Sequence, residues 1–298
     1  GFLIAADRRE GAIKNTRRFF MKRVMSIQDI SCLGKCSLTV ALPIISAMGI
    51  ETAIVPIAVL STHTNFDNFT FRDLTDDLIP IKNHWLKEGF KFDAIYTGYL
   101  GSKEQVDIVS EYFDAFKTKD NYIIVDPAMA DNGEMYSGFT PDFALKMTAL
   151  CSKADIILPN ITEASLILGA KYPGEDADVD TIKSMLLQLS KLGSKNVVIT
   201  GVKTNPGQLG FVGYNSNEDS FFCYSTKEVP IKSHGTGDVF ASTFTGALMN
   251  GYSIFGALKI AADFTYKCIQ NNYNDKDSVD YGVNFEAEIP SLLRMIGK

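Results

Sequence analysis

The amino-acid sequence predicts an α/β fold in which a mostly parallel sheet is covered by helices on both faces. Strand-like and helix-like patterns alternate with short connections from about residue 22 to residue 200, and this alternation is typical of a parallel sheet. The run over residues 52–60 is apolar and rich in β-branched residues, as expected for a strand buried on both faces. The 298 residues are 46% hydrophobic, so the chain needs no disulfide or metal to support its core.

The elements follow one another without an internal repeat or a linker, which favours a single domain over residues 21–298. We expect strands at residues 24–27, 52–60, 92–97, 122–125, 156–158 and 197–200. Helices are expected between them at residues 37–48, 74–88, 103–116, 141–151, 163–168 and 179–192. Glycines close two of these helices, Gly49 the first and Gly169 the fifth, and Asp126-Pro127 ends the strand at 122–125.

The pattern changes after residue 200. Two alternating segments, 208–214 and 220–228, flank a turn-prone stretch and predict an antiparallel hairpin. Helices are then expected at residues 237–249, 254–270 and 286–295. Residues 1–20 lack the periodicity of a core element, and we predict that they are disordered or a non-native extension.

Composition excludes several classes of function. The net charge is −6, with both signs interspersed, which argues against nucleic-acid binding. The five cysteines are scattered, and Cys32 and Cys36 have no second Cys/His pair to complete a zinc site. The longest apolar run, residues 38–50, is too short to span a bilayer. The amino terminus is apolar first and basic second, the reverse of a secretory signal. These features predict a cytoplasmic protein with reduced cysteines that does not interact with membranes.

The segment Gly235-Thr236-Gly237-Asp238 stands at the start of a helix rich in small residues. Glycines let backbone N–H groups approach an anion, and the helix amino terminus adds positive partial charge. Asp238 falls in the first helical turn, where a carboxylate can take a proton from a substrate hydroxyl. The alternative is an acidic first-turn residue that only complements the helix dipole.

Further oxygen ligands follow two predicted strands. Asp126 ends the strand at 122–125, and Asn160 and Glu163 follow the strand at 156–158. Ligands bind at the carboxyl ends of parallel strands, and this set suits a water-rich Mg²⁺ site shared with phosphates. Each residue also has a structural alternative, a helix cap for Glu163 and a turn before proline for Asp126.

Taken in order and spacing, these segments resemble the ribokinase-like superfamily and, within it, the pyridoxal kinase family. The resemblance covers the chain from about residue 22 to the carboxyl end. The matching segments are Ser26-Ile27-Gln28, Ser61-Thr62-His63-Thr64, Thr97-Gly98-Tyr99-Leu100-Gly101, Asp126-Pro127 with Asp131, Leu158-Pro159-Asn160 with Glu163, and Gly235-Thr236-Gly237-Asp238.

The resemblance implies a ribokinase-like fold and ATP-dependent phosphorylation of the 5′-hydroxymethyl group of a B6 vitamer. It implies Asp238 as catalytic base and an anion hole of Gly235, Thr236 and Gly237. The ATP-binding positions that it implies are Asp126, Asn160, Glu163, Thr200, Val229 and Thr236, with Asp126 and Glu163 also serving the metal. The vitamer-binding positions that it implies are Asp29, His63, Thr64, Tyr99, Tyr136 and Asp238. It further implies Mg²⁺, ATP as co-substrate, a monovalent cation such as K⁺, small-molecule substrates and a homodimer.

One position departs from the family. Pyridoxal kinases carry Ser after the Ile-Gln pair, where it touches the pyridine ring, whereas this chain has Asp29. A carboxylate there can pair with a protonated pyridine nitrogen or accept from the 3′-hydroxyl, which opens the choice of vitamer. It can instead bind local backbone groups.

Three rival functions differ in how well they fit. Sugar kinases of the superfamily carry a long lid after the first strand, and too few residues separate Asp29 from the helix at Ser37 for a separate lid domain. A hydroxymethylpyrimidine kinase also lacks a lid and is the closer rival, although the segments at His63 and Tyr99 favour the B6 enzyme. A non-catalytic ligand-binding relative is disfavoured by the intact Asp238 and its flanking glycines.

Overall fold

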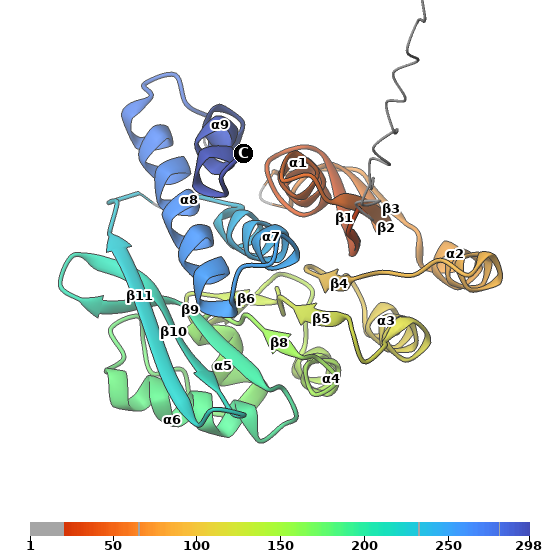
Figure 1. The fold of residues 1–298 in the computed structure, drawn as a ribbon, viewed down its shortest axis with the longest axis horizontal. Helices are drawn as coiled ribbons and strands as arrows, with labels where there is room; N and C mark the ends of the chain where they lie inside the picture. Colours follow the sequence, from red (N-terminus) through yellow and green to blue (C-terminus); the bar gives the residue numbers. More distant parts are fainter. Residues whose placement is uncertain (1–20, 65, 232, 280) are drawn as a thin grey trace, which may run out of the picture.

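A nine-stranded sheet forms the centre of the part of the chain that the structure describes, residues 21–298 without 65, 232 and 280 (Figure 1). The structure is a computed structural model. The strand order is β11-β10-β9-β8-β5-β4-β1-β2-β3. The strands are β1 (Arg23–Leu33), β2 (Glu51–Thr62), β3 (Phe71–Asp73), β4 (Ala94–Thr97), β5 (Tyr122–Val125), β8 (Ile156–Ile157), β9 (Asn196–Asn205), β10 (Gln208–Asn215) and β11 (Ser220–Lys227).

The six inner strands, from β9 to β2 in the sheet order, run parallel, while β3, β10 and β11 add antiparallel edges. The four residues of β4 are all buried, which agrees with the continuous apolar pattern of strands covered on both faces. Because the inner strands are parallel, their carboxyl ends meet at one edge of the sheet, and the loops that follow them lie together there.

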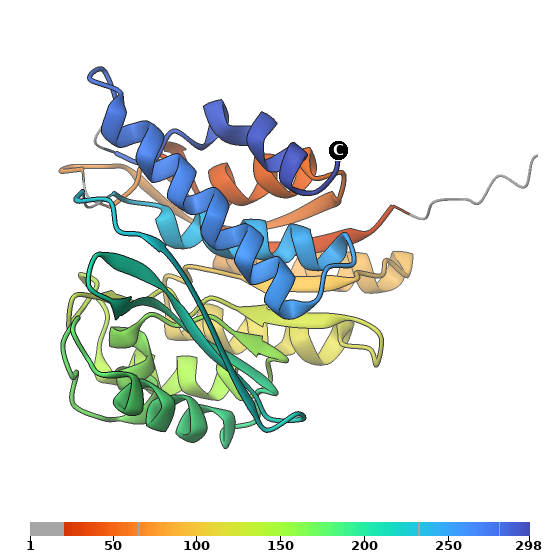
Figure 2. The same cartoon turned by 60° about the vertical axis from the view of Figure 1, so that its left-hand side comes forward.

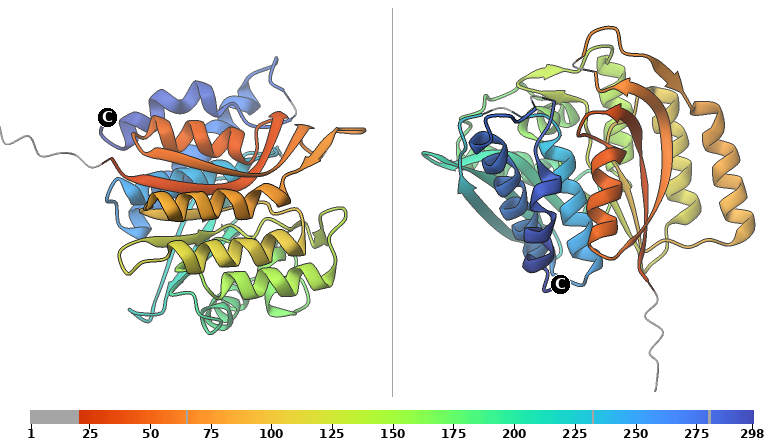
Figure 3. Two further views of the ribbon diagram at one scale, coloured as in Figure 1. Left: turned by 90° about the vertical axis from the view of Figure 1, so that its right-hand side faces the viewer. Right: turned by 90° about the horizontal axis from the view of Figure 1, so that it is seen from above.

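Helices cover both faces of the sheet (Figures 2 and 3). Four pack on one face: α1 (Leu38–Ala47), α7 (Thr236–Met249), α8 (Ile254–Asn274) and α9 (Phe285–Met295). The other face carries α2 (Thr75–Glu88), α3 (Lys103–Phe116), α4 (Pro141–Cys151), α5 (Ile161–Leu168) and α6 (Val179–Ser190). The sheet therefore separates two hydrophobic cores, one against each helical layer.

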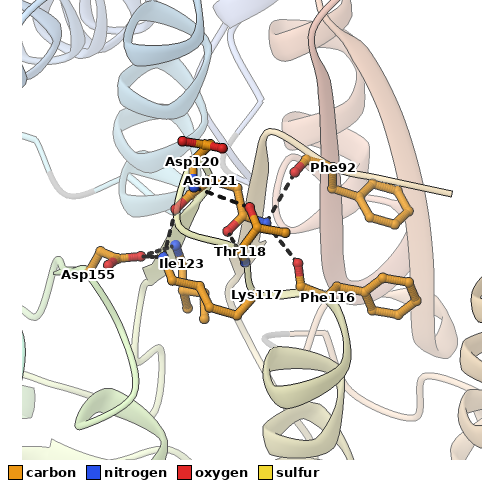
Figure 4. Close-up of polar contacts among 8 residues, drawn as sticks. All are labelled: Phe92, Phe116, Lys117, Thr118, Asp120, Asn121, Ile123 and Asp155. Carbon is orange, nitrogen blue, oxygen red and sulfur yellow. Dashed lines mark hydrogen bonds and ion pairs between the residues drawn. The ribbon is translucent and has the colours of Figure 1, made fainter.

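A polar network organises the opposite edge of the sheet, where β5 begins (Figure 4). The Asn121 side-chain amide donates to the carbonyls of Phe92 and Phe116, at 3.2 and 2.8 Å. The Asp155 carboxylate accepts from the Ile123 N–H at 2.7 Å and pairs with Lys117. These bonds satisfy buried polar groups of the α3–β5 connection and fix where β5 enters the sheet.

The predicted fold class is confirmed, because the sheet is mostly parallel and helices lie on both faces. The structure adds three short strands that the sequence analysis did not predict, namely β3 and the small hairpin of β6 (Ala130–Asp131) and β7 (Glu134–Met135). The prediction for residues 1–20 falls outside the described residues. Within that described part, no helix has the combination of length and apolar character that crossing a bilayer requires.

Candidate active site

The start of α7 forms a tight turn that only glycine fits. Gly235 is the N-cap residue, with a left-handed φ of 74°. A Cβ added to Gly235 would lie 1.8 Å from the carbonyl oxygen of Lys35, so both the backbone angle and the space exclude a side chain. Asp238 follows in the first turn and is half-buried. The backbone N–H groups at this helix start are therefore open to an anion beside the Asp238 carboxylate.

Two more carboxylates come from neighbouring strand ends. Asp126 follows β5 and is 8% exposed, and Glu163 lies in the first turn of α5 after β8 and is 3% exposed. Glu163 forms a capping box with Asn160, each side chain accepting from the other's backbone N–H at 2.9 Å. A second Glu163 oxygen accepts from the Met129 N–H at 3.1 Å. The helix-cap role of Glu163 is thus real, and it holds the carboxylate in place at the pocket.

A cavity of about 370 Å³ joins these elements. It brings together ten of the residues that the sequence analysis singled out. These lining residues are Asp126, Tyr136, Asn160, Glu163, Thr200, Val229, Gly235, Thr236, Gly237 and Asp238. Residues that lie far apart in the sequence, from β5, α5, β9 and α7, therefore meet in one pocket at the carboxyl edge of the sheet.

Burial raises the pKa of all three carboxyl groups in this pocket. It raises the pKa of Glu163 to about 8 and that of Asp238 to about 7, while hydrogen bonds to each carboxylate oppose the rise. The pKa of Asp126 is also held well above its usual range, by burial first and then by the charges of Glu163 and Asp238. Three carboxylates that resist ionisation together are arranged to receive a cation or to accept a proton.

The raised pKa values predict how stability depends on pH. A carboxyl whose folded pKa is raised binds more protons in the folded than in the unfolded state, so stability falls as pH rises from about 4 to about 8. We expect the metal-free, nucleotide-free protein to melt at a lower temperature at pH 8.5 than at pH 5.5. Asp126→Asn removes one of these charges. One pKa unit is about 1.4 kcal/mol, so this variant should melt at least ~3 °C above wild type at pH 8.5.

The same variant provides the control. At pH 5.5 the folded carboxyl is still neutral and only the ionisation of the unfolded chain separates the two proteins, so the advantage of the variant should be smaller than at pH 8.5. Thermal melting in EDTA gives the melting temperatures of wild type and of Asp126→Asn at pH 5.5 and at pH 8.5. A wild-type melting temperature that is independent of pH, or an Asp126→Asn variant without advantage at pH 8.5, would show that the carboxylates are not electrostatically strained.

Four predicted vitamer-binding residues lie outside the cavity lining. Asp29 is 4% exposed in β1, and His63 is 8% exposed after β2, where its Nε2 lies 3.2 Å from the Tyr281 carbonyl oxygen. Thr64 beside it is exposed, and the Tyr99 ring stacks on Phe139 with centroids 5.5 Å apart. Burial and the charge of Asp29 raise the pKa of Tyr99 to about 12. Asp29 also acts electrostatically on Asp238, so it lies near the proposed base, on the β1 side of the pocket.

A family model described as phosphomethylpyrimidine kinase matches residues 42–281, which is well over half of the chain. The chain belongs to this kinase family. A crystal structure named for the same family, from Bacteroides thetaiotaomicron, is 36% identical and superposes with a TM-score of 0.88 over 93% of this chain and 96% of that one. A second crystal form of that protein contains pyridoxal, with a TM-score of 0.87 over 91% of this chain and 96% of that one.

Two other relatives carry different names. The pyridoxal kinase of Lactobacillus plantarum is 28% identical, with a TM-score of 0.84 over 92% of this chain and 97% of that one. The hydroxymethylpyrimidine/phosphomethylpyrimidine kinase of Bacillus subtilis is 28% identical over 188 residues, 62% of this chain and 66% of its own length. The chain is therefore a kinase with the ribokinase-like fold, similar to kinases named for B6 vitamers and for thiamine precursors.

Sequence reasoning missed one wall of the kinase pocket. Ala262, Tyr266 and Ile269 on α8 line it together with Phe240 of α7. The α8 residues are spaced by four and three, the signal of one helical face, but an apolar helical face is ordinarily read as core. Because the same cavity also holds the anion cradle, this apolar wall is suited to a flat ring attached to a phosphate chain.

The hairpin of β6 and β7 was also missed, although the sequence contained its signal. Asn132 and Gly133 connect the two strands with φ values of 53° and 84°, the positive angles of a two-residue hairpin turn, for which Asn-Gly is the commonest pair. The hairpin leads to Tyr136, whose N–H donates to the Met129 carbonyl at 2.9 Å. This bond sets Tyr136 over the pocket beside Asp126 and Glu163.

The Asp126 carboxylate is the group in the pocket that is best placed to hold a magnesium ion. Among the described residues, no hydrogen bond reaches the Asp126 carboxylate, so its oxygens are open to the cavity. No cluster of three or more His, Cys, Asp or Glu suited to a metal is found among the same residues. The Asp126 carboxylate could serve as one ligand of a hard cation such as Mg²⁺, which prefers oxygen ligands and keeps several waters.

Proposed function

We propose that this kinase transfers the γ-phosphoryl group of ATP to the 5′-hydroxymethyl group of a B6 vitamer. The observation that carries the proposal is the likeness to the Bacteroides thetaiotaomicron protein, which is 36% identical and whose crystal contains pyridoxal. The pocket supplies what the reaction needs: a carboxylate with a pKa near 7 beside an anion cradle at a helix amino terminus.

The proposed roles follow from the position of each group. Asp238 accepts the proton of the substrate hydroxyl as the hydroxyl oxygen bonds to the γ-phosphorus, and the bond from that phosphorus to the bridging oxygen breaks to release ADP. The N–H groups at the start of α7, from Gly235 to Gly237, stabilise the negative charge that spreads over the transferred phosphoryl group. Asn160 and Glu163 hold each other in the capping box, which keeps that edge of the pocket rigid. The apolar wall of α8 receives the nucleotide base.

Magnesium belongs to the proposal as well. Asp126 and Glu163 would hold it, directly or through water, and its charge would offset that of the phosphate oxygens. The expected monovalent cation and the expected homodimer stay predictions. Comparing the turnover rate in K⁺ with that in Na⁺ tests the monovalent cation. Gel filtration with light scattering tests the homodimer.

A hydroxymethylpyrimidine kinase is the second candidate, favoured by the family description and by the Bacillus subtilis relative. Both substrates offer a hydroxymethyl group on a flat heteroaromatic ring, so the groups in the pocket suit either substrate. The test is a panel of pyridoxal, pyridoxine, pyridoxamine, hydroxymethylpyrimidine and its phosphate, and ribose, each with Mg·ATP. We expect the highest kcat/KM for one of the three B6 vitamers. Turnover restricted to the pyrimidines would assign the second function, and turnover restricted to ribose would contradict both.

A further inference from the structure

The loop between β1 and α1 packs directly against the anion cradle, the backbone N–H groups of residues 235–237. The carbonyl oxygen of Lys35 in this loop occupies the space where a Cβ on Gly235 would lie. The helices that follow the two segments, α1 and α7, lie side by side (Figure 3). Because groups packed this closely move together, the position of the Lys35 backbone limits where the turn at the start of α7 can lie.

The connection between α8 and α9, together with the first turn of α9, holds the other groups of Lys35. Its backbone N–H donates to the Tyr281 carbonyl at 3.4 Å, and a Cβ added to Gly282 would lie 2.4 Å from the Lys35 Cβ. The Lys35 Nζ donates to the Asn284 side-chain oxygen at 3.1 Å and to the Glu286 carboxylate at 2.8 Å. The Lys35 side chain is only 16% exposed. Lys35 therefore links this segment to the anion cradle.

The start of α9 lacks its own side-chain cap and binds Lys35 instead. Asn284 is the N-cap residue of α9, a position where an asparagine oxygen commonly accepts an N–H of the first turn. The Asn284 side chain makes no such bond, and its oxygen accepts from the Lys35 Nζ. A lysine beside a helix amino terminus also faces positive partial charge, which the Glu286 carboxylate offsets. The stability of α9 alone therefore gives no reason for a lysine at this position.

We propose that Lys35 is a positioning residue for the anion cradle. Asn284 and Glu286 hold its ammonium group, and its backbone in turn fixes the position of the turn at Gly235. The inference rests on the proposed function, in which the cradle stabilises the transferred phosphoryl group. Because that charge develops in the transition state, a loosened turn should lower kcat more than it weakens substrate binding.

Two substitutions of Lys35 test the role of its ammonium group. Lys35→Met keeps an unbranched apolar side chain but loses all three donors. A displacement of about 1 Å can cost about 10²-fold in rate, and the backbone of residue 35 still holds the turn in part. We therefore expect kcat to fall about tenfold, while KM for ATP and for the acceptor changes less than about threefold. Lys35→Arg keeps the charge and donors, so its kcat should stay within about threefold of wild type.

Lys298→Met is the matched control. The Lys298 Nζ donates to the Met48 carbonyl, at the end of α1, and to the Asn250 side-chain oxygen, at the end of α7, at 2.5 and 2.8 Å. This substitution therefore removes a similar lysine anchor from the same two helices, at the ends away from the cradle. It should lower the melting temperature, as Lys35→Met does, but leave kcat within about twofold of wild type.

Hydrogen exchange tests the inference without any turnover. The Val239 N–H donates to the Gly235 carbonyl at 3.0 Å, so its exchange rate reports on local opening of the first turn of α7. We expect this amide to exchange at least about threefold faster in Lys35→Met than in wild type. Lys298→Met should leave its rate unchanged. The rates are measured by NMR on the full chain without ligand.

Four results would overturn the inference: Lys35→Met keeps its kcat, Lys35→Arg is as slow as Lys35→Met, Lys298→Met is equally slow, or exchange at Val239 is the same in Lys35→Met as in wild type. A role confined to stability gives the first of these, with a lowered melting temperature and an unchanged rate. Kinetics are measured on whichever panel substrate the wild type turns over. If it turns over none, the proposed function fails, and the exchange rates still decide whether Lys35 holds the turn.

Discussion

Replacing Asp238 by Asn should lower kcat by about 10²–10⁴, the usual contribution of a general base. The amide keeps the shape of the carboxylate, so the start of α7 keeps its geometry. It cannot take the hydroxyl proton. Affinity for Mg·ATP should change little, because the backbone N–H groups of Gly235 to Gly237 remain. Steady-state kinetics and a nucleotide titration measure the two effects separately.

Asp126→Asn is the comparison variant, since it also neutralises a buried carboxylate in the same cavity. Its carboxylate faces the proposed metal, so its loss should weaken Mg·ATP binding at least about tenfold and lower the rate as well. If Asp238→Asn kept a near-normal kcat, Asp238 would be only a residue that complements the helix dipole. If both variants lost nucleotide affinity equally, the separate roles would be wrong.

Replacing Gly235 by Ala should damage both stability and catalysis. A Cβ at φ 74° is strained, and its position 1.8 Å from the Lys35 carbonyl oxygen forces the two loops apart. Strain and overlap together should cost at least about 2 kcal/mol, which lowers the melting temperature by at least ~4 °C. Because the displaced turn carries the anion cradle, kcat should fall about 10²-fold or more. Thermal melting and initial rates measure the two losses.

Gly237→Ala is the matched control for stability. Gly237 lies two residues further on, inside α7, and an added Cβ would meet nothing closer than the Asp126 carboxylate oxygen at 3.9 Å. Alanine is favoured over glycine inside a helix, so this variant should melt at or above the wild-type temperature. A Gly235→Ala variant that melts like Gly237→Ala would show that the turn at the start of α7 tolerates a side chain.

The sequence predicted the elements with strong periodicity closely. The helix at residues 103–116, the strand at 122–125 and the helix at 141–151 have the predicted bounds. The ends of β1 and β9 were placed too early, because both strands extend past the apolar run into the polar residues that approach the site. β3 has three exposed residues, so its sequence lacks the alternation of a half-buried strand, and it pairs antiparallel with the outer edge of β2.

Site residues could be predicted from the sequence where they follow a strand end or a glycine-rich helix start. Asp126 and Glu163 could be found because parallel strands end at one edge, and Asp238 because it follows two glycines at a helix start. The structure brings all three into one cavity. The apolar wall on α8 could not be found, since an apolar helical face has the same sequence pattern whether it packs in the core or lines a cavity. The surroundings of Asp29 likewise required the fold to be seen: the side chain is 4% exposed in β1 and accepts from the Ser31 hydroxyl at 3.1 Å.

Product analysis of one reaction tests the central claim most directly. The wild-type protein is incubated with Mg·ATP and an equimolar mixture of the three B6 vitamers. ADP and each phosphorylated product are then quantified by chromatography with mass detection, beside a reaction without vitamer. The account predicts that ADP forms only with vitamer present, with one 5′-phosphate monoester made per ADP. ADP that forms equally without vitamer, or an absence of any vitamer 5′-phosphate, would contradict it.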